Sequence, residues 1–397
     1  MGATMSYNIN MVKFLIAGVK SDVGLRNYLL KNGGSNGQWK GPEKHGCTTY
    51  MKHNEVYKRL KSLPSDPTVH RQNNLGFQRL NSVIWPELDN PVIGLGQTNE
   101  NHAFVRHYLD KTLGPNGNWS KEMIQESVKD FFDKRTKFNT NDFKIWTTIL
   151  LHKIHFNITL TWKEGEDFMN MQKILLISIA PSESLMRNRF VQYMIGLDKA
   201  LENKAKYLQR YINAIDKIFD DIPEDKKTLL ASNFMDSLLF AGGQSVPTVL
   251  SYCIGLKYSS WLQKKLPNFE LTNENMAQYI MEVIRFFPPV SGFVYRNAEE
   301  TVYLSLHTAQ CDKDAWSEDA EEFKLRDMKV YREKMVAWAN PSLGGNNSRV
   351  CPGKDLSFII IYEMLKEFIK CDWKADEKPG DVRVNGYSIS SVNLDRV

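Results

Sequence analysis

The stretch NNSRVCPGK, residues 346–354, places a cysteine directly before Pro-Gly and at the start of an apolar run. The run is formed by Leu356, Phe358, Ile359, Ile360, Ile361, Met364, Leu365 and Phe368. Proline fits the first turn of a helix, because its missing N–H would have no partner there. We therefore expect Cys351 at the mouth of a buried helix, where free N–H groups and the helix dipole favour a thiolate. A thiolate is a good soft ligand for iron, although a cysteine that only packs in the core fits this stretch equally well.

The composition is that of an ordinary globular protein with a large core. The 397 residues are 42% hydrophobic and 24% charged, and this length is compatible with more than one domain. The net charge of +5 is spread without a block of like charges, so we expect no nucleic-acid partner. A mildly basic chain can still present a basic face to an acidic protein or an anionic membrane.

The cysteines and the first apolar run bear on the cellular compartment of the protein. The five cysteines, Cys47, Cys253, Cys311, Cys351 and Cys371, have neither a disulfide pattern nor the spacing of a zinc site. The early run FLIAGV, residues 14–19, is too short to span a bilayer. We therefore expect a cytoplasmic protein in a reducing compartment, without a transmembrane anchor and at most peripheral at a membrane surface.

The segment NENHAFVRHYL, residues 99–109, is predicted to be a helix that carries two cationic or polar donors on one face. His102 and Arg106 are four residues apart, and this spacing brings their side chains together. Two such donors near a helix start form a carboxylate or phosphate site. A solvated polar face is the alternative, which this pattern taken alone favours.

Residues 229–256 are apolar for most of their length but contain FAGGQSVPT at residues 240–248. Two glycines and a proline inside a buried helix are costly. They predict a kink that frees backbone groups and lets a ligand approach; a simple break between two helices is the alternative.

The segment NENMAQYIMEVIRFF, residues 273–287, is predicted to be a helix that ends at Pro288-Pro289. Its Glu282 and Arg285 are three residues apart and can pair. An exposed ion pair would contribute little. The neighbouring residues are apolar almost all round, however, so we expect a buried pair with further internal partners.

Taken together and in this order, these motifs resemble the cytochrome P-450 superfamily of heme-thiolate proteins, from about Cys47 to the C-terminus. Glu282 and Arg285 match the superfamily's Glu-x-x-Arg, and Arg349, Cys351 and Gly353 match its cysteine loop. The resemblance implies a mainly α fold with small β-sheets, in one domain spanning 1–397. Its β-containing part is expected at about 1–100 and its helical part at about 100–397. A heme b is expected between the long kinked helix and the helix after the cysteine.

The resemblance also assigns the heme contacts. Cys351 is the implied axial ligand of the iron. The implied propionate ligands are His102, Arg106, Arg296 and Arg349, where Arg296 follows the Glu-x-x-Arg helix in FVYRNA. Several cations facing a buried cofactor with two carboxylates agree with the cost of burying unpaired charge.

The chain departs from the superfamily pattern around the cysteine. The superfamily usually has Phe seven residues before the cysteine and Gly four before it, whereas Gly344 and Asn347 stand here. The arginine that completes the Glu-x-x-Arg network usually lies in a Pro-Glu-Arg-Phe-like stretch. Here EFKLRDM, residues 322–328, offers only the displaced Arg326.

A further departure bears on the reaction. Where monooxygenases of the superfamily carry Ala-Gly-x-Asp/Glu-Thr, this chain has AGGQS, residues 241–245. Gln244 cannot donate a proton as a carboxylic acid does, and Ser245 keeps only the hydroxyl. Together with the Cys-x-Gly-Lys-Asp sequence at 351–355, this resembles the allene oxide synthase and hydroperoxide lyase branch, although Leu239 replaces that branch's asparagine.

Three functions remain open at this stage. The first is a heme-thiolate enzyme that uses a lipid hydroperoxide without a reductase, with Gly242, Gln244 and Ser245 as catalytic candidates. Its apolar pocket would be formed by Leu239, Ala241, Val290 and Phe293. The second is a monooxygenase of a hydrophobic substrate, fed by a ferredoxin or a flavoprotein reductase. The third is a heme-binding scaffold without turnover.

Overall fold

The computed structural model describes residues 38–40, 47–62, 84–85, 99–179, 189–290, 292–296, 301–339, 350–376, 384–385, 388–389 and 391–397. Its α-helices are α3 (His53–Ser62), α5 (Asn99–Leu113), α6 (Lys121–Asp133), α7 (Asp142–Phe156), α8 (Trp162–Ile179), α10 (Arg189–Ile195), α11 (Leu197–Ile218), α12 (Lys227–Asp236), α13 (Gly242–Lys257), α14 (Ser260–Lys265), α15 (Met276–Phe286), α16 (Leu306–Ala309), α17 (Lys313–Trp316), α18 (Met328–Lys334) and α19 (Lys354–Phe368). A π-helical segment, η5 (Ser237–Ala241), joins α12 to α13, and 3₁₀ turns are η4 (Glu224–Lys226) and η6 (Ala337–Ala339). The mainly α prediction is confirmed.

The strands form three small sheets. They are β1 (Gln38–Lys40), β2 (Cys47–Tyr50), β3 (Lys137–Asn139), β4 (Gly292–Arg296), β5 (Thr301–Ser305), β6 (Trp373–Ala375), β7 (Val384–Asn385), β8 (Ser388–Ile389) and β9 (Asn393–Arg396). The largest sheet has the order β1-β2-β5-β4, in which β2 and β5 run parallel and the other pairs antiparallel. The order β3-β9-β6 forms the second sheet, and β7 pairs with β8. Strands from the last third of the chain therefore complete the sheet that begins near the N-terminus.

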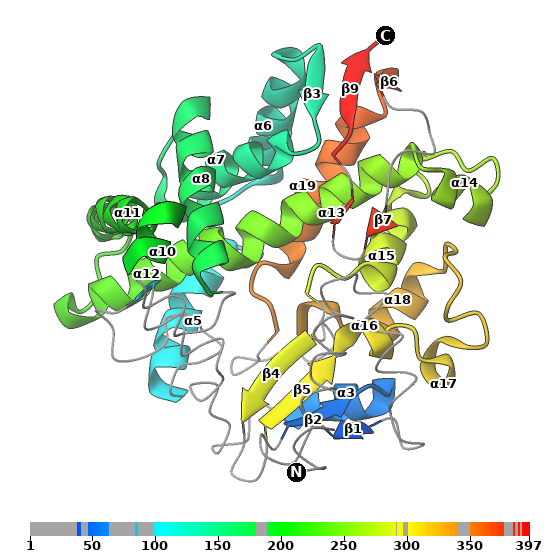
Figure 1. Ribbon diagram of the computed structural model, residues 1–397, viewed down its shortest axis with the longest axis horizontal. Coiled ribbons are helices and arrows are strands. Elements are labelled where there is room, and N and C mark those ends of the chain that lie inside the picture. The colour runs from blue at the N-terminus through cyan, green and yellow to red at the C-terminus, as the bar shows by residue number, and fades with distance from the viewer. Residues whose placement is uncertain are drawn as a thin grey trace.

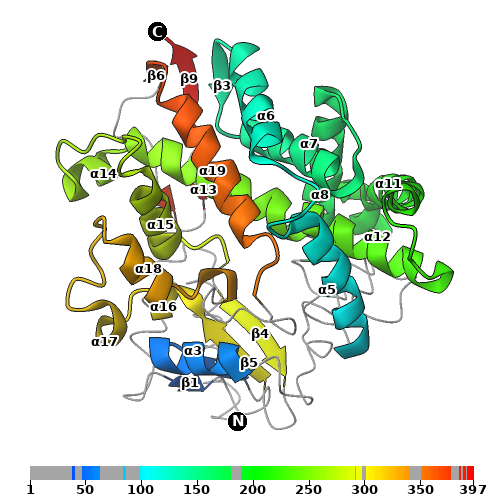
Figure 2. The same cartoon turned by 180° about the vertical axis from the view of Figure 1, so that it is seen from behind.

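Helices α6, α7, α8 and α11 lie at the opposite end of the molecule from the largest sheet. Figure 1 shows α6, α7, α8 and α11 at one end and β1, β2, β4, β5 and α3 at the other. In Figure 2, the view from behind, α19 again crosses α13, and α5 lies beside α12. No helix among the described residues has both the length and the apolarity that crossing a bilayer requires.

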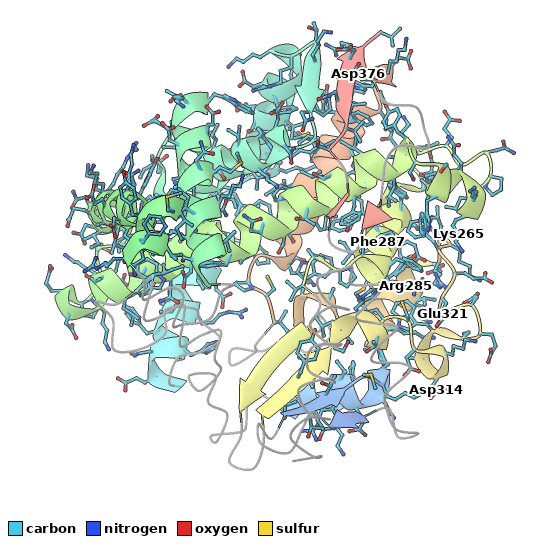
Figure 3. All side chains as sticks on the ribbon, viewed as in Figure 1. Lys265, Arg285, Phe287, Asp314, Glu321 and Asp376 are labelled. Carbon is cyan, nitrogen blue, oxygen red and sulfur yellow. The ribbon has the colours of Figure 1, made fainter. Side chains whose placement is uncertain are left out.

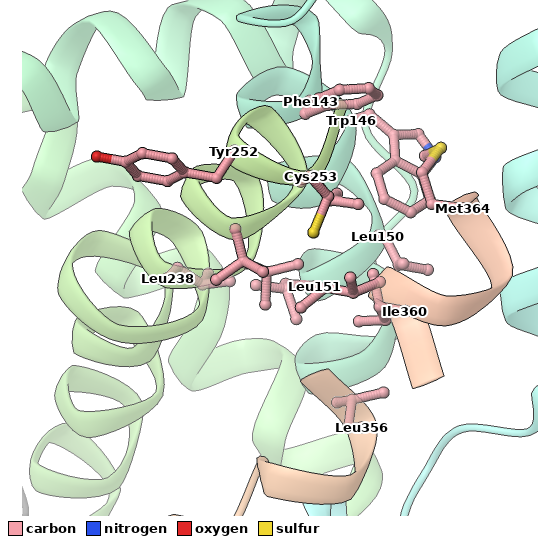
Figure 4. Packing of buried hydrophobic residues seen from close by; sticks show 14 of the residues in the cluster. Phe143, Trp146, Leu150, Leu151, Leu238, Tyr252, Cys253, Leu356, Ile360 and Met364 are labelled. Carbon is pink, nitrogen blue, oxygen red and sulfur yellow. The ribbon is translucent and has the colours of Figure 1, made fainter. Parts of the chain in front are cut away.

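The core is centred on the crossing of α13 with α7 and α19. Figure 4 shows the side chains that meet there: Phe143, Trp146, Leu150 and Leu151 of α7, Cys253 of α13, Leu356, Ile360 and Met364 of α19, and Leu238, whereas the nearby Tyr252 of α13 points away from them. Each is at most 4% exposed. Burial of this kind contributes roughly 25 cal/mol per Å² of apolar surface, so the crossing holds these helices firmly in place.

Candidate functional site

Cys351 lies in a tight turn before α19. Its backbone N–H donates to the carbonyl of Trp338 at 2.9 Å, and its carbonyl accepts from the N–H of Lys354 at 3.3 Å. Trp338 has a left-handed backbone (φ 58°), and its indole N–H donates to Ser357 Oγ at 3.1 Å. The cysteine is thereby fixed to α19 from both sides. Pro352 was expected in the first turn of the helix, but it lies in this turn and α19 begins two residues later.

The charge state of Cys351 differs from the expectation at a helix N-terminus. Burial raises the pKa of its thiol, and this effect exceeds the lowering by the Gly353 N–H and by the charges of Arg106 and Lys354. The prediction that the helix start favours a thiolate included the N–H donors, which do lower this pKa, but left out the larger opposing cost of desolvation. A coordinated metal deprotonates a thiol outright, so ligation rather than the helix would produce the thiolate.

Arg106 connects α5 to the cysteine loop. Its guanidinium donates to the carbonyl of Val350, the residue before the cysteine, and its Nε lies 2.8 Å from both carboxylate oxygens of Asp110. His102 lies one turn earlier on α5 and is half-buried. The predicted cationic face of α5 thus lies beside Cys351.

Arg296 and Arg349 are the other two residues expected at the propionates. Arg296 ends β4, where its backbone pairs with Thr301; its side chain is outside the described atoms. Arg349 lies outside the described residues altogether.

The long helix runs without a break from Lys227 to Lys257 and is kinked at η5, as predicted. The N–H of Gly242 donates to the carbonyl of Ser237, five residues back. Ala241 has a distorted backbone (φ −89°, ψ −94°) where α13 begins. Pro247 lies inside α13. The kink is therefore a π-turn, a feature frequent at functional sites.

The side chain of Gln172, on α8, takes up the carbonyls that the π-turn releases. Its amide nitrogen lies 3.0 Å from Leu238 O and 2.7 Å from Leu239 O, and the residue is 1% exposed. Local sequence pattern does not single out Gln172, because its partners are more than sixty positions away in the chain.

The expected catalytic and pocket residues differ in burial. Gly242, Gln244 and Ser245 are half-buried, and Ala241 is exposed although it lies within a long central helix. Leu239 is fully buried, whereas Val290 is 42% exposed. The backbone of Phe293 pairs with Leu304 in the sheet, and its side chain is not described.

The donor set fits a heme. One axial ligand from the protein is enough to hold a heme iron, and within the described residues no three His, Cys, Asp or Glu side chains gather as a multi-ligand metal site would require. Cys351 offers that one soft ligand, and Arg106 offers a cation beside it. Ala241, Gln244 and Ser245 keep accessible surface on the long helix, while Leu238 and Leu239 are fully buried.

Glu282 and Arg285 form a bidentate ion pair on α15. Their contacts are 2.7 Å (Nη2–Oε1) and 2.8 Å (Nε–Oε2), and both residues are 0% exposed. Arg285, which Figure 3 shows on the same side of the molecule as Glu321, also donates to the carbonyls of Gln310, Ala320 and Glu322 at 2.7–2.8 Å. Burial lowers the pKa of Arg285, but the bond to Glu282 and its charge outweigh burial and raise it.

Arg326 completes this network despite its displaced position in the sequence. Its Nη1 donates to Glu282 Oε1 at 2.7 Å, and its Nη2 donates to the carbonyl of Asp319 at 2.8 Å. Tyr331, which the sequence did not single out, donates its hydroxyl to Glu282 Oε2 at 2.8 Å. One carboxylate thus joins α15, α18 and the segment between α17 and α18, so the helix that packs on α19 is fixed in place.

Comparisons with known proteins were made by sequence and by structure. No protein-family model and no curated protein matches the sequence significantly. The structure resembles P450BioI solved with an acyl-carrier protein (TM-score 0.61, 16% identity, 93% of this chain and 97% of that one). It also resembles epothilone D-bound cytochrome P450epoK (TM-score 0.63, 16% identity, 91% of this chain and 93% of that one). A third similar structure is the cytochrome P450 CYP109B1 from Bacillus subtilis (TM-score 0.62, 14% identity, 93% of this chain and 98% of that one). The chain has the cytochrome P-450 fold.

Proposed function

We propose that this chain is a heme-thiolate enzyme of the cytochrome P-450 type, with Cys351 as the axial ligand. The observation that carries the proposal is the contact of Arg106 with the carbonyl next to the cysteine. It brings the cationic face of α5 to Cys351, which among the described cysteines is the free thiol that directly precedes a core helix. His102 and Arg106, with Arg296 and Arg349, are the residues proposed for the two propionates.

The proposed reaction uses a peroxide, with a lipid hydroperoxide as the favoured substrate. A thiolate-bound heme supplies the cleavage of the O–O bond. On the long helix, the amide of Gln244 and the hydroxyl of Ser245 donate hydrogen bonds that orient the peroxide. Neither is a carboxylic acid, so a substrate that already contains the O–O bond suits them. Leu239, Ala241, Val290 and Phe293 are proposed to line the apolar pocket.

A reductase-dependent monooxygenase is the second candidate, and Ser245 favours it. Its half-buried hydroxyl stands where monooxygenases carry threonine, and it can relay a proton. In that case the hydrophobic substrate is hydroxylated or epoxidised, and a ferredoxin or flavoprotein reductase delivers electrons.

The cofactor is tested on protein expressed with ample heme supply. We expect the reduced protein with carbon monoxide to give the difference spectrum of a thiolate-bound heme. Cys351→Ala removes it, and Cys371→Ala is the matched control, because Cys371 is also a half-buried free cysteine. A spectrum that is unchanged in Cys351→Ala, or a protein that takes up no heme, would overturn the assignment.

The reaction is tested on the same holoprotein. Rapid consumption of a fatty-acid hydroperoxide without reductant supports the peroxide reaction. Inertness towards the peroxide, with turnover only after NADPH and a redox partner are added, supports the monooxygenase instead. Inertness in both assays leaves a heme-binding scaffold.

A further inference from the structure

The π-turn shifts the backbone hydrogen bonds of the long helix. In an uninterrupted α-helix the N–H of Gly242 would donate to Leu238 O, four residues back. Here it donates to Ser237 O. The carbonyls of Leu238 and Leu239 are buried, and a buried carbonyl without a hydrogen bond costs about 1–3 kcal/mol. The carbonyl of Leu238 has lost its α-helical donor, so a donor from outside the helix stabilises the turn.

Gln172 is that donor. Its side-chain amide has two N–H donors, and the nitrogen lies 3.0 Å from Leu238 O and 2.7 Å from Leu239 O. One side chain on α8 thus donates to two neighbouring carbonyls of the turn. The contact is buried, so water cannot substitute for the amide at low cost.

The surroundings of the turn are adapted to it. A Cβ at position 243 would lie 1.8 Å from Leu238 O and 3.3 Å from the amide nitrogen of Gln172, so only glycine fits there. A Cβ at position 242 would lie 3.0 Å from Leu151 Cδ1 of α7. At the start of the turn, Ser237 Oγ is hydrogen-bonded to His155 Nε2 at 2.7 Å. Helices α7 and α8 therefore hold the turn from two sides.

The π-turn sets the direction of the residues that follow it. One extra residue in a helix of 3.6 residues per turn rotates everything downstream by about 100°. Gln244 and Ser245 come directly after the turn. Without it they would leave the helix in a different direction.

We propose that Gln172 is a positioning residue, which holds the π-turn and so aims Gln244 and Ser245 at the ligand on the heme iron. This inference rests on the proposed function for the role of Gln244 and Ser245. That Gln172 stabilises the π-turn follows from its two hydrogen bonds and does not depend on the proposed function.

The test uses the infrared stretch of carbon monoxide bound to the reduced holoprotein, which reports polar groups next to the ligand. Gln172→Leu removes both donors at similar size and is expected to shift or broaden the band. Gln125→Leu is the matched control: that amide donates a single bond, to Glu363 on α19 at 2.9 Å, and the variant should leave the band unchanged. For turnover we expect kcat to fall on the order of 10- to 100-fold in Gln172→Leu, with little change in KM.

A variant that lacks both side chains after the turn distinguishes a positioning role of Gln172 from a general disturbance of the fold. In protein carrying Gln244→Ala and Ser245→Ala, Gln172→Leu should cause no further change of the band. A further change there, or an unshifted band in Gln172→Leu itself, overturns the proposal. Gly243→Ala keeps the Gln172 amide but crowds Leu238 O and the amide nitrogen within the same turn, and it should reproduce the shift, so poor folding of Gln172→Leu does not end the test.

Hydrogen exchange of the backbone amides in residues 238–245 provides a readout that does not need heme. Gln172→Leu should increase exchange there, and Gln125→Leu should not. A chain that takes up no heme would refute the proposed function while this measurement still decides whether Gln172 holds the turn. Normal heme binding with unchanged exchange would refute only the inference about Gln172.

Discussion

Replacing Glu282 by glutamine should be among the most destabilising single changes in this protein. The carboxylate accepts five hydrogen bonds, from Arg285 twice, Arg326, Tyr331 and the N–H of Lys324. Glu282→Gln keeps the shape but removes the negative charge between two guanidinium groups. It also places an N–H₂ group against donors, so at least one of them loses its acceptor.

The magnitude follows from the burial of the three charges. Glu282 and Arg285 are 0% exposed and Arg326 is 8% exposed. Removing one partner of a buried ion pair costs about 3–5 kcal/mol, because the remaining charge is left without compensation. Folded proteins are stable by about 5–15 kcal/mol in total, so the variant should lose about a fifth of its stability or more.

The control is Glu363→Gln. Glu363 is 5% exposed, but its cation Lys121 is 54% exposed at 3.3 Å, and its other partner is the neutral Gln125. Removing this charge leaves a solvated lysine, so we expect a cost of about 1 kcal/mol.

Urea unfolding followed by circular dichroism measures both variants. The midpoint of Glu282→Gln should fall by on the order of 1 M relative to Glu363→Gln. Combining Glu282→Gln with Arg326→Met removes the excess cation, so the pair should cost at least about 1 kcal/mol less than the sum of the single changes. Equal midpoints for the two glutamine variants, or strict additivity in the double variant, would refute the reasoning.

Three further predictions concern buried positions. Burial lowers the pKa of His155 to about 3 from 6.5, and the pKa of His152 to about 4. The unfolded chain therefore binds protons first as the pH falls, and His155→Phe should flatten the loss of stability by roughly 1.4 kcal/mol per pH unit between pH 6 and 4 in urea titrations. Burial raises the pKa of Asp236 well above its ordinary value, so Asp236→Asn should raise the melting temperature at pH 8 and have little effect near pH 4. Gly165→Ala should cost about 1–3 kcal/mol in calorimetry, since its Cβ would lie 2.9 Å from Ile149 Cγ1.

The sequence predicted those parts of the fold that depend on local pattern. Periodicity and end signals predicted the helix at 273–287, which is α15 within a few residues. The glycines and the proline at 242–247 predicted the kink, because their backbone cost is intrinsic to the residue type.

The parts that depend on long-range contacts were not predictable in this way. Gln172 is an ordinary residue of an amphipathic helix until the chain brings Leu238 and Leu239 against it. Tyr331 gains its role from Glu282, forty-nine positions away. The raised pKa of Cys351 depends on how the folded chain surrounds the thiol, which the local sequence at the helix start does not show.

The two sides of the candidate site are held by different forces, and this makes their roles separable. On the cysteine side the contacts are charged: Arg106 holds the loop, and the Glu282 network fixes the helix that packs on α19. On the long-helix side the contacts are neutral, and Gln172 acts on the backbone. Loss of charge at Glu282 should therefore weaken heme retention while leaving the carbon monoxide stretch of the remaining holoprotein unchanged. Loss of the Gln172 amide should change the carbon monoxide stretch but not heme retention, because its two bonds reach only the carbonyls of the long helix. If both variants moved both quantities together, the site would respond as one cooperative unit, and neither residue could be assigned to one side of it.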